Sequence, residues 1–92
     1  MLLGFNKMEK IKKIYIVIPA FNEEESIVKV LEDLFYHGYK NIVVVDDASN
    51  DQTTETIKNF NVSLVKHPVN MGPGAAIKTG IDFALLDGAD II

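Results

Sequence analysis

The chain contains no cysteine and no arginine. The lack of cysteine excludes disulfides, cysteine-ligated zinc, iron–sulfur clusters and thiol catalysis. All nine basic residues are lysine, and 13 acidic residues outnumber them, so the formal net charge is −4. Proteins that bind nucleic acid usually carry a basic stripe and an alkaline isoelectric point. The composition therefore argues against DNA or RNA as a partner.

Long apolar runs are also missing. No stretch approaches the roughly 18 apolar residues of a membrane span, and the N-terminus lacks the signal-peptide core of about 7–15 apolar residues. We therefore expect a cytoplasmic protein. The 92 residues, 48% hydrophobic and 24% charged, fit one soluble globular domain with a thin core.

Residues 1–12 form a predicted lead-in segment. Four of the nine lysines gather in or directly after it, at Lys7, Lys10, Lys12 and Lys13. This cluster either keeps the segment solvated or gives weak attraction to an anionic membrane surface. The second interpretation would place the protein peripherally at the cytoplasmic face of a membrane.

Strands are predicted from short runs of β-branched residues. The runs at 14–18 and 42–45 do not alternate between polar and apolar residues, which is typical of strands buried on both faces of a parallel sheet. A shorter and more polar run at 62–65 predicts a third strand. Residues 90–92 indicate the opening of a fourth strand, which we expect beside the first.

Helices are predicted after each of the three strands. Apolar residues at helical spacing predict a helix over about 23–37, with Asn22 as its N-cap, Glu25 as the reciprocating carboxylate and Gly38 as a left-handed C-cap. Turn and capping residues then lead into a short helix that ends at Ile57.

A third amphipathic helix is predicted from about Ala75 to Leu85, and Gly88 ends it. Strand and helix thus alternate three times, which predicts the α/β class, with an open parallel sheet of the Rossmann-like kind. Because the sequence stops two residues into a strand, we expect residues 13–92 to be the front part of a larger domain.

Polar clusters follow all three strands, at 19–24, 46–51 and 67–74. The carboxyl ends of parallel strands meet at one edge of the sheet, where loops separate and helix N-termini converge. A binding site is therefore predicted at this edge.

The glycine pattern disfavours two common nucleotide-binding motifs. The first turn, at 19–24, contains no glycine, and no glycine-rich loop ends in Lys-Ser or Lys-Thr. NAD-type Rossmann enzymes and P-loop NTPases need those patterns to bring the backbone close to phosphates. Neither class is expected.

Asp46 and Asp47 are adjacent carboxylates at the end of the second predicted strand. In one interpretation, one carboxylate accepts hydrogen bonds from the following turn and the other accepts from a ligand N–H, such as a ring N–H of uracil or guanine. In the other interpretation, both acids only tie the turn and cap the next helix. The pair alone leaves both open.

The segment 70–74 places small residues and free backbone N–H groups before the third helix, which indicates either an anion or backbone contact or simply a tight loop. Gly80 is expected to allow close approach of that helix to the sheet. His67 is expected to be a surface or turn residue, and Asp82 and Asp87 to be solvated charges.

Taken in order, the segments 16–24, 43–53 and 70–80 resemble the front half of a family 2 glycosyltransferase. They read IVIPAFNEE, VVVDDASNDQT and NMGPGAAIKTG. Among such enzymes the sequence is most similar to dolichyl-phosphate and polyprenyl-phosphate sugar synthases, the mannose synthases among them. The resemblance covers about residues 13–92.

The resemblance implies a GT-A fold whose front half binds the nucleotide of a UDP- or GDP-sugar. It implies seven nucleotide-sugar-binding residues: Pro19, Phe21 and Glu23 around the base and ribose, Asp46 and Asp47 at the base, and Gly72 and Gly74 beside the nucleotide. The reaction implied for the whole enzyme is sugar transfer to a polyprenyl-phosphate lipid or another acceptor.

Such enzymes also carry an Asp-x-Asp motif after the fourth strand, which holds Mg²⁺ or Mn²⁺ against the diphosphate. Ile92 falls short of that position, so the metal ligands and the acceptor site are expected beyond this chain. We therefore expect no catalytic residue and no metal ligand within it, and no turnover by the 92 residues alone.

The alternative function is a non-catalytic half-domain that binds a nucleotide, or that completes its sheet with another chain. An exposed edge of the first strand would favour self-association in either case. An extended protein that carries the metal motif would distinguish the two, because only an enzyme would then show metal-dependent transfer.

Overall fold

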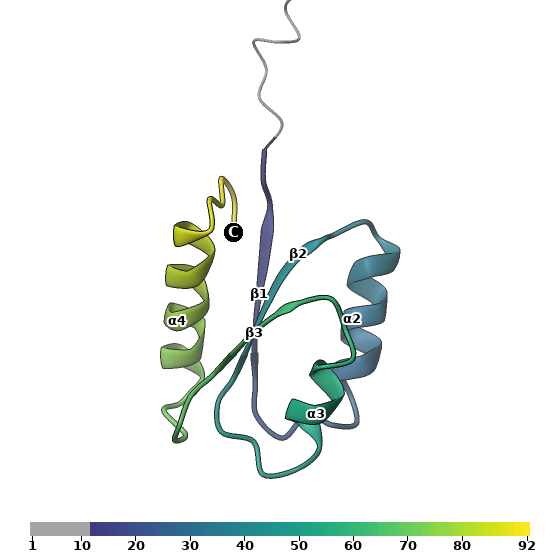
Figure 1. Ribbon diagram of the computed structural model, residues 1–92, viewed down its shortest axis with the longest axis vertical. Coiled ribbons are helices and arrows are strands. Elements are labelled where there is room, and N and C mark those ends of the chain that lie inside the picture. Colours follow the sequence, from purple (N-terminus) through teal and green to yellow (C-terminus); the bar gives the residue numbers. More distant parts are fainter. Residues whose placement is uncertain (1–11) are drawn as a thin grey trace, which may run out of the picture.

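The computed structural model describes residues 12–92, which form a parallel sheet with helices on both faces (Figure 1). The elements in chain order are β1 (Tyr15–Ala20), α2 (Ile27–Tyr36), β2 (Asn41–Asp46), α3 (Thr53–Ile57), β3 (Ser63–Lys66) and α4 (Pro73–Leu86). This confirms the predicted α/β class with alternating strands and helices. All of the predicted lead-in segment except Lys12 lies outside the described residues.

The sheet has the order β1-β2-β3, and both pairs of neighbouring strands are parallel. Tyr15 lies opposite Asn41, and Val43 lies opposite Ser63. The central strand β2 is buried on both faces, since Val43, Val44 and Val45 are each 0% exposed. The run at 42–45 thus lies in a strand buried on both faces, as predicted. The run at 14–18 was predicted to be buried in the same way, but β1 lies at the edge of the sheet and its residues 16–19 are only half-buried.

Two hydrophobic cores lie on the two faces of the sheet, with α2 and α3 on one side and α4 on the other (Figure 1). The first core contains Ala20, Ile27, Leu31, Ile42, Val44 and Ile57. The second contains Tyr15, Val43, Val45, Ala76 and Ala84. Successive residues of β2 therefore alternate between the two cores, as the period of a strand requires.

Gly80 lets α4 lie close to the sheet, as predicted. A Cβ atom at this position would collide with Cγ1 of Val17 and come within 3.2 Å of Cγ2 of Val45. The helix presents small residues to the sheet on this face, because Ala76, Gly80 and Ala84 are its buried residues.

The helix ends are partly as predicted. Gly38 and Gly88 have φ angles of 91° and 94° and end α2 and α4. The predicted N-cap at Asn22 is wrong, because α2 begins at Ile27 and no side chain caps it. Asn22 has a φ of 53°, and its Oδ1 accepts a hydrogen bond from the Asn50 N–H at 2.8 Å. Its side chain joins two loops instead of starting a helix.

The outer edge of β1 has a neighbour only at its beginning within residues 12–92. Ile14 forms a parallel bridge with Ile91, and the Tyr15 N–H donates to the Ile91 carbonyl at 2.8 Å. This confirms the predicted place of the fourth strand beside the first. The same turn brings the Tyr15 hydroxyl onto the Asp87 carboxylate, so Asp87 is not the purely solvated charge that we predicted.

Asp82, the other predicted solvated charge, pairs with Lys78 at 2.8 Å on the exposed side of α4. Among residues 12–92, no helix is both long enough and apolar enough to cross a membrane.

Candidate functional site

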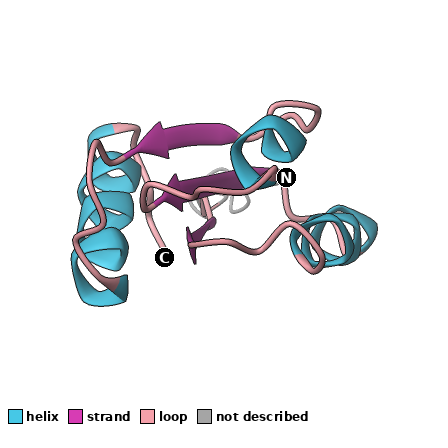
Figure 2. Cartoon of the chain, turned by 90° about the horizontal axis from the view of Figure 1, so that it is seen from below, coloured by secondary structure: helices cyan, strands magenta, loops and turns pink. Residues whose placement is uncertain are grey.

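The three polar clusters lie together at the carboxyl ends of the strands. These ends are at the bottom of Figure 1, and Figure 2 views the molecule from that side. The chain links the clusters directly: the Asp47 N–H donates to the Ala20 carbonyl at 2.8 Å, and the His67 N–H donates to the Asp46 carbonyl at 2.9 Å. The expected convergence at one edge is therefore observed.

A pocket of about 400 Å³ opens at this edge between the end of β1 and the start of α4. We call it the strand-end pocket, and it is lined by Pro19, Ala20, Phe21, Glu23, Asp47, Asn70, Pro73 and Ala76. Its lining is mainly apolar, and Phe21 is 40% exposed, so its ring is available to a ligand. Ligand sites commonly combine apolar walls with a few polar groups of this kind.

Asp47 is the buried polar group of the strand-end pocket, at 3% exposure. Its Oδ1 accepts from the Met71 N–H at 2.9 Å and lies 2.8 Å from Nδ1 of His67. Its Oδ2 accepts from the Gly72 N–H at 2.8 Å. The Met71 N–H, followed by the His67 ring, lowers the pKa of the Asp47 carboxyl despite its burial. The group is therefore an ionised carboxylate that holds the loop before α4.

Asp46 has different surroundings and is fully buried. Its Oδ1 accepts from the backbone N–H and the hydroxyl of Ser49, and its Oδ2 accepts from the hydroxyl of Thr54. It borders a separate pocket, with Ser49 and His67 among that pocket's lining residues. Because side chains alternate along an extended chain, the adjacent carboxylates point to different places. Asp46 ties the turn after β2, and Asp47 borders the strand-end pocket.

The prediction that His67 is a surface or turn residue is wrong. The side chain is 8% exposed, and its Nδ1 and Nε2 lie 2.8 Å from Asp47 Oδ1 and 2.8 Å from Thr79 Oγ1, respectively. Asp46 lies opposite Lys66 in the parallel register, so the next residues, Asp47 and His67, emerge side by side. The register between β2 and β3 is the feature from which the Asp47–His67 contact could have been predicted.

The glycines at the start of α4 do not line the strand-end pocket, although Pro73 between them does. Gly72 precedes the helix with a φ of 96°, a conformation that favours glycine, and this directs its N–H to Asp47. Gly74 lies in the first turn of α4, and a Cβ atom there would meet nothing within 4 Å.

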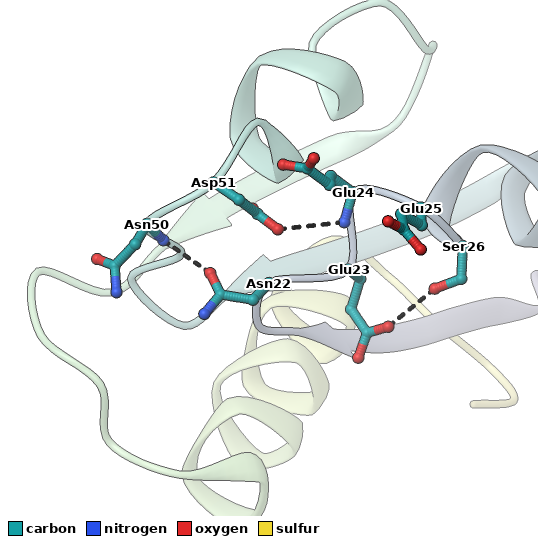
Figure 3. A pocket seen from close by; sticks show the side chains of 7 residues that line it. All are labelled: Asn22, Glu23, Glu24, Glu25, Ser26, Asn50 and Asp51. Carbon is teal, nitrogen blue, oxygen red and sulfur yellow. Dashed lines mark hydrogen bonds between the residues drawn. The ribbon is translucent and has the colours of Figure 1, made fainter.

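A second pocket, of about 610 Å³, has an acidic lining (Figure 3). Its residues are Asn22, Glu23, Glu24, Glu25, Ser26, Asn50 and Asp51. Several of its carboxylates already serve the protein: Glu23 accepts from the Ser26 hydroxyl at 2.8 Å, and Asp51 accepts from the Glu24 N–H at 3.4 Å. Burial acts to raise the pKa of Asp51, but hydrogen bonds from Thr53 and Glu24 outweigh it and lower that pKa.

The acidic pocket suits neither a diphosphate nor a metal ion. Its four carboxylates would repel a negatively charged ligand. No group of three or more histidine, aspartate or glutamate side chains within residues 12–92 is arranged to hold a metal ion. The strand-end pocket, with its mainly apolar walls and one buried carboxylate, is therefore the candidate site for a ring-containing ligand.

The structure brings four of the seven predicted site residues into the strand-end pocket: Pro19, Phe21, Glu23 and Asp47. Asp46, Gly72 and Gly74 lie outside its lining. Our prediction did not name the other four lining residues as site residues: Ala20, Asn70, Pro73 and Ala76. Asn70 belongs to the loop that the sequence marked, but Ala76 reads as an ordinary core residue of a helix.

We next compared the chain with known protein families, and one family model matches it. The model of the family described as "Glycosyl transferase family 2" matches residues 15–89, which include every helix and strand of the described part of the chain.

The chain is also similar in sequence to several known proteins. The chain is 50% identical over 80 residues to an uncharacterized protein of Methanocaldococcus jannaschii, covering 87% of this chain and 33% of that protein. It is 39% identical over 97 residues to the UDP-N-acetylglucosamine–dolichyl-phosphate N-acetylglucosaminyltransferase of Methanococcus voltae, covering 87% and 39%. It is 36% identical over 80 residues to a dolichyl-phosphate beta-glucosyltransferase of Trichomonas vaginalis, covering 71% and 25%. The chain thus spans less than half the length of these relatives.

Proposed function

Because this chain belongs to glycosyltransferase family 2, we propose that it supplies the nucleotide-binding part of an enzyme that moves a sugar from a UDP- or GDP-sugar to a polyprenyl-phosphate acceptor. Two relatives are named as dolichyl-phosphate sugar transferases, which supports the acceptor class. The observation that carries the proposal is the strand-end pocket, with an aromatic ring at its mouth and an ionised carboxylate in its lining.

Asp47 is the group that would recognise the base. An ionised carboxylate can accept about four hydrogen bonds, two on each oxygen. Three of these are used, by His67, Met71 and Gly72, so Oδ2 keeps one free position. The ring N–H of uracil or guanine can donate to it. Cytosine and adenine present an acceptor nitrogen at the corresponding ring position, so they would be disfavoured.

The walls of the pocket suit the rest of the nucleoside. Phe21 and Pro19 offer apolar surface on which a flat base can stack, and Glu23 offers a carboxylate for ribose hydroxyls. Gly74 lies in the first turn of α4, a helix of 14 residues, where free N–H groups favour phosphate and no side chain stands in the way. We place Gly72 and Gly74 beside the nucleotide on this basis.

Members of the family generally use a divalent metal ion. The described residues do not fit such a site, because no three ligating side chains converge within residues 12–92. We propose Mg²⁺ or Mn²⁺ as the ion, with ligands from outside these residues. A lipid-phosphate acceptor would also require the site to meet a membrane surface, and we place the protein peripherally at its cytoplasmic face.

The nucleotide site is tested by titrating the 92-residue chain with UDP, GDP and CDP while recording its amide NMR spectrum. We expect UDP or GDP to shift the amides of Phe21, Asp47 and Gly72, and CDP to bind more weakly. Asp47→Asn should weaken binding by about 1–3 kcal/mol, because it replaces one of the two buried acceptor oxygens with an NH₂ donor and leaves too few acceptors for both the loop and the base. Phe21→Ala should weaken it by about 1 kcal/mol through lost stacking.

Glu24→Gln, in the acidic pocket, is the matched control and should leave nucleotide affinity unchanged. The fold of each variant is checked from the dispersion of its amide spectrum, because Asp47 also holds the loop before α4. A well-dispersed wild-type spectrum that responds to none of the three nucleotides would refute the proposed function.

A second candidate function, an assembly half-domain, is favoured by the outer edge of β1. Tyr15 directs its N–H away from β2, and by the alternation of a parallel strand Val17 does the same. Beyond Ile91, this edge has no strand neighbour among residues 12–92. We propose that the edge pairs with a second copy of the chain when no other strand covers it.

A further inference from the structure

His67 lies behind the strand-end pocket and not in it. It does not line that pocket, yet its ring joins the end of β3 to two other parts of the fold, Asp47 after β2 and Thr79 on α4. It is 8% exposed, and both of its ring nitrogens have a partner at 2.8 Å. A histidine held on both sides in this way has a fixed orientation.

We propose that His67 is a positioning residue for nucleotide recognition, which orients the Asp47 carboxylate so that the free acceptor position of Oδ2 faces the base. This inference rests on the proposed function, since it concerns how the same pocket selects its base.

The chemistry of the partners fixes the tautomer of the His67 ring. The carboxylate of Asp47 is ionised, as its lowered pKa indicates, and an ionised carboxylate only accepts hydrogen bonds. Nδ1 of His67 therefore carries the hydrogen and donates to Asp47 Oδ1. In the neutral ring, Nε2 is then an acceptor, and the hydroxyl of Thr79 donates to it.

The hydrogen bond from His67 matters because of how the donors are distributed over the two oxygens of Asp47. Oδ1 receives two donors, His67 and Met71, whereas Oδ2 receives only Gly72. The vacant position therefore lies on one defined oxygen. Without the His67 donor, each oxygen would have one loop N–H and one vacancy, so an incoming base would no longer find a single oxygen with a free acceptor position.

Two variants of His67 distinguish orientation of the Asp47 carboxylate from simple packing of the ring volume. His67→Asn keeps a donor at the same reach, because Nδ2 of asparagine and Nδ1 of histidine are both bonded to Cγ, but it leaves the ring volume empty. His67→Phe keeps the ring volume and removes the donor. Positioning predicts that His67→Phe weakens UDP or GDP binding by about threefold to tenfold and that His67→Asn recovers most of it. A purely structural role predicts the reverse order.

The tautomer is read directly from the unmodified protein, which keeps the proposal testable if a variant does not fold. A long-range ¹H–¹⁵N spectrum of the labelled chain should show a hydrogen on Nδ1 of His67. The chain has one other histidine, His37, which is exposed on α2's C-terminal side. His37→Phe is the matched control and should leave nucleotide affinity unchanged.

The outcomes distinguish this inference from the function on which it rests. Wild-type binding of UDP or GDP, together with equal binding by His67→Phe, overturns the positioning role and leaves the proposed function standing. A hydrogen found on Nε2 with none on Nδ1 also overturns the positioning role. A folded wild-type chain that binds neither nucleotide overturns both.

Discussion

Among the glycines of residues 12–92, Gly80 has the least room for an added side chain. A Cβ at Gly80 would collide with Cγ1 of Val17 on β1 and come within 3.2 Å of Cγ2 of Val45 on β2. Val45 is fully buried at the centre of the sheet, so it has no free space into which to move. Gly80→Ala therefore forces either α4 outward or the two valines out of their rotamers.

The expected cost follows from two opposed effects. Overpacking of a well-packed core costs about 1–3 kcal/mol, and the severity of the Val17 overlap favours the upper half of that range. Alanine gains up to about 1 kcal/mol over glycine inside a helix. We therefore expect Gly80→Ala to lower the free energy of unfolding by about 1–2 kcal/mol.

Urea denaturation followed by far-UV circular dichroism measures this loss. For a domain of this size, with a denaturant dependence of about 1 kcal/mol per molar, the midpoint should fall by about 1–2 M. Gly74→Ala is the matched control in the same helix, because a Cβ there meets nothing within 4 Å. It should leave the midpoint unchanged or raise it slightly. A Gly80→Ala variant as stable as the wild type would refute the close packing of α4.

Two further predictions concern stability at low pH and self-association through the outer edge of β1. The lowered pKa of Asp47 means that its carboxylate stabilises the fold fully above its ordinary value of 3.8, and that this contribution is lost as the pH falls through the lowered value. Urea midpoints should therefore fall in strong acid, and less so in Asp47→Asn; an equal acid loss in both proteins would contradict the assignment. At the outer edge of β1, sedimentation velocity over a concentration series should show reversible self-association, and a monomer at every concentration would remove the edge proposal.

Much of the fold could be predicted because each element has its own local signal. Runs of β-branched residues marked β1 and β2, and glycines with positive φ marked the ends of α2 and α4. The place of Ile91 beside Ile14 was expected from the strand order of doubly wound sheets. The start of α2 was mispredicted because Asn22 has two possible partners, a helix N-terminus nearby or a loop from another strand, and the sequence does not rank them.

The candidate site, too, was predicted only in part. The resemblance named Pro19, Phe21, Glu23 and Asp47, and the structure gathers them in one pocket. The resemblance did not distinguish the roles of Asp46 and Asp47. In the structure Asp46 ties the turn after β2, whereas Asp47 lines the strand-end pocket. Nor did the resemblance place His67, whose partners are 20 and 12 residues away in the chain.

The sequence by itself determined the alternation of strands and helices, the polar edge of the sheet and the family, because these depend on residue types at short spacing. Tertiary structure decided which carboxylate borders the strand-end pocket, which oxygen of Asp47 keeps a free acceptor position, and that His67 is buried. These depend on the register between β2 and β3 and on the closeness of α4, which bring together residues that no local pattern relates. Hydrogen bonds act over about 3 Å, so only the folded arrangement settles which groups form them.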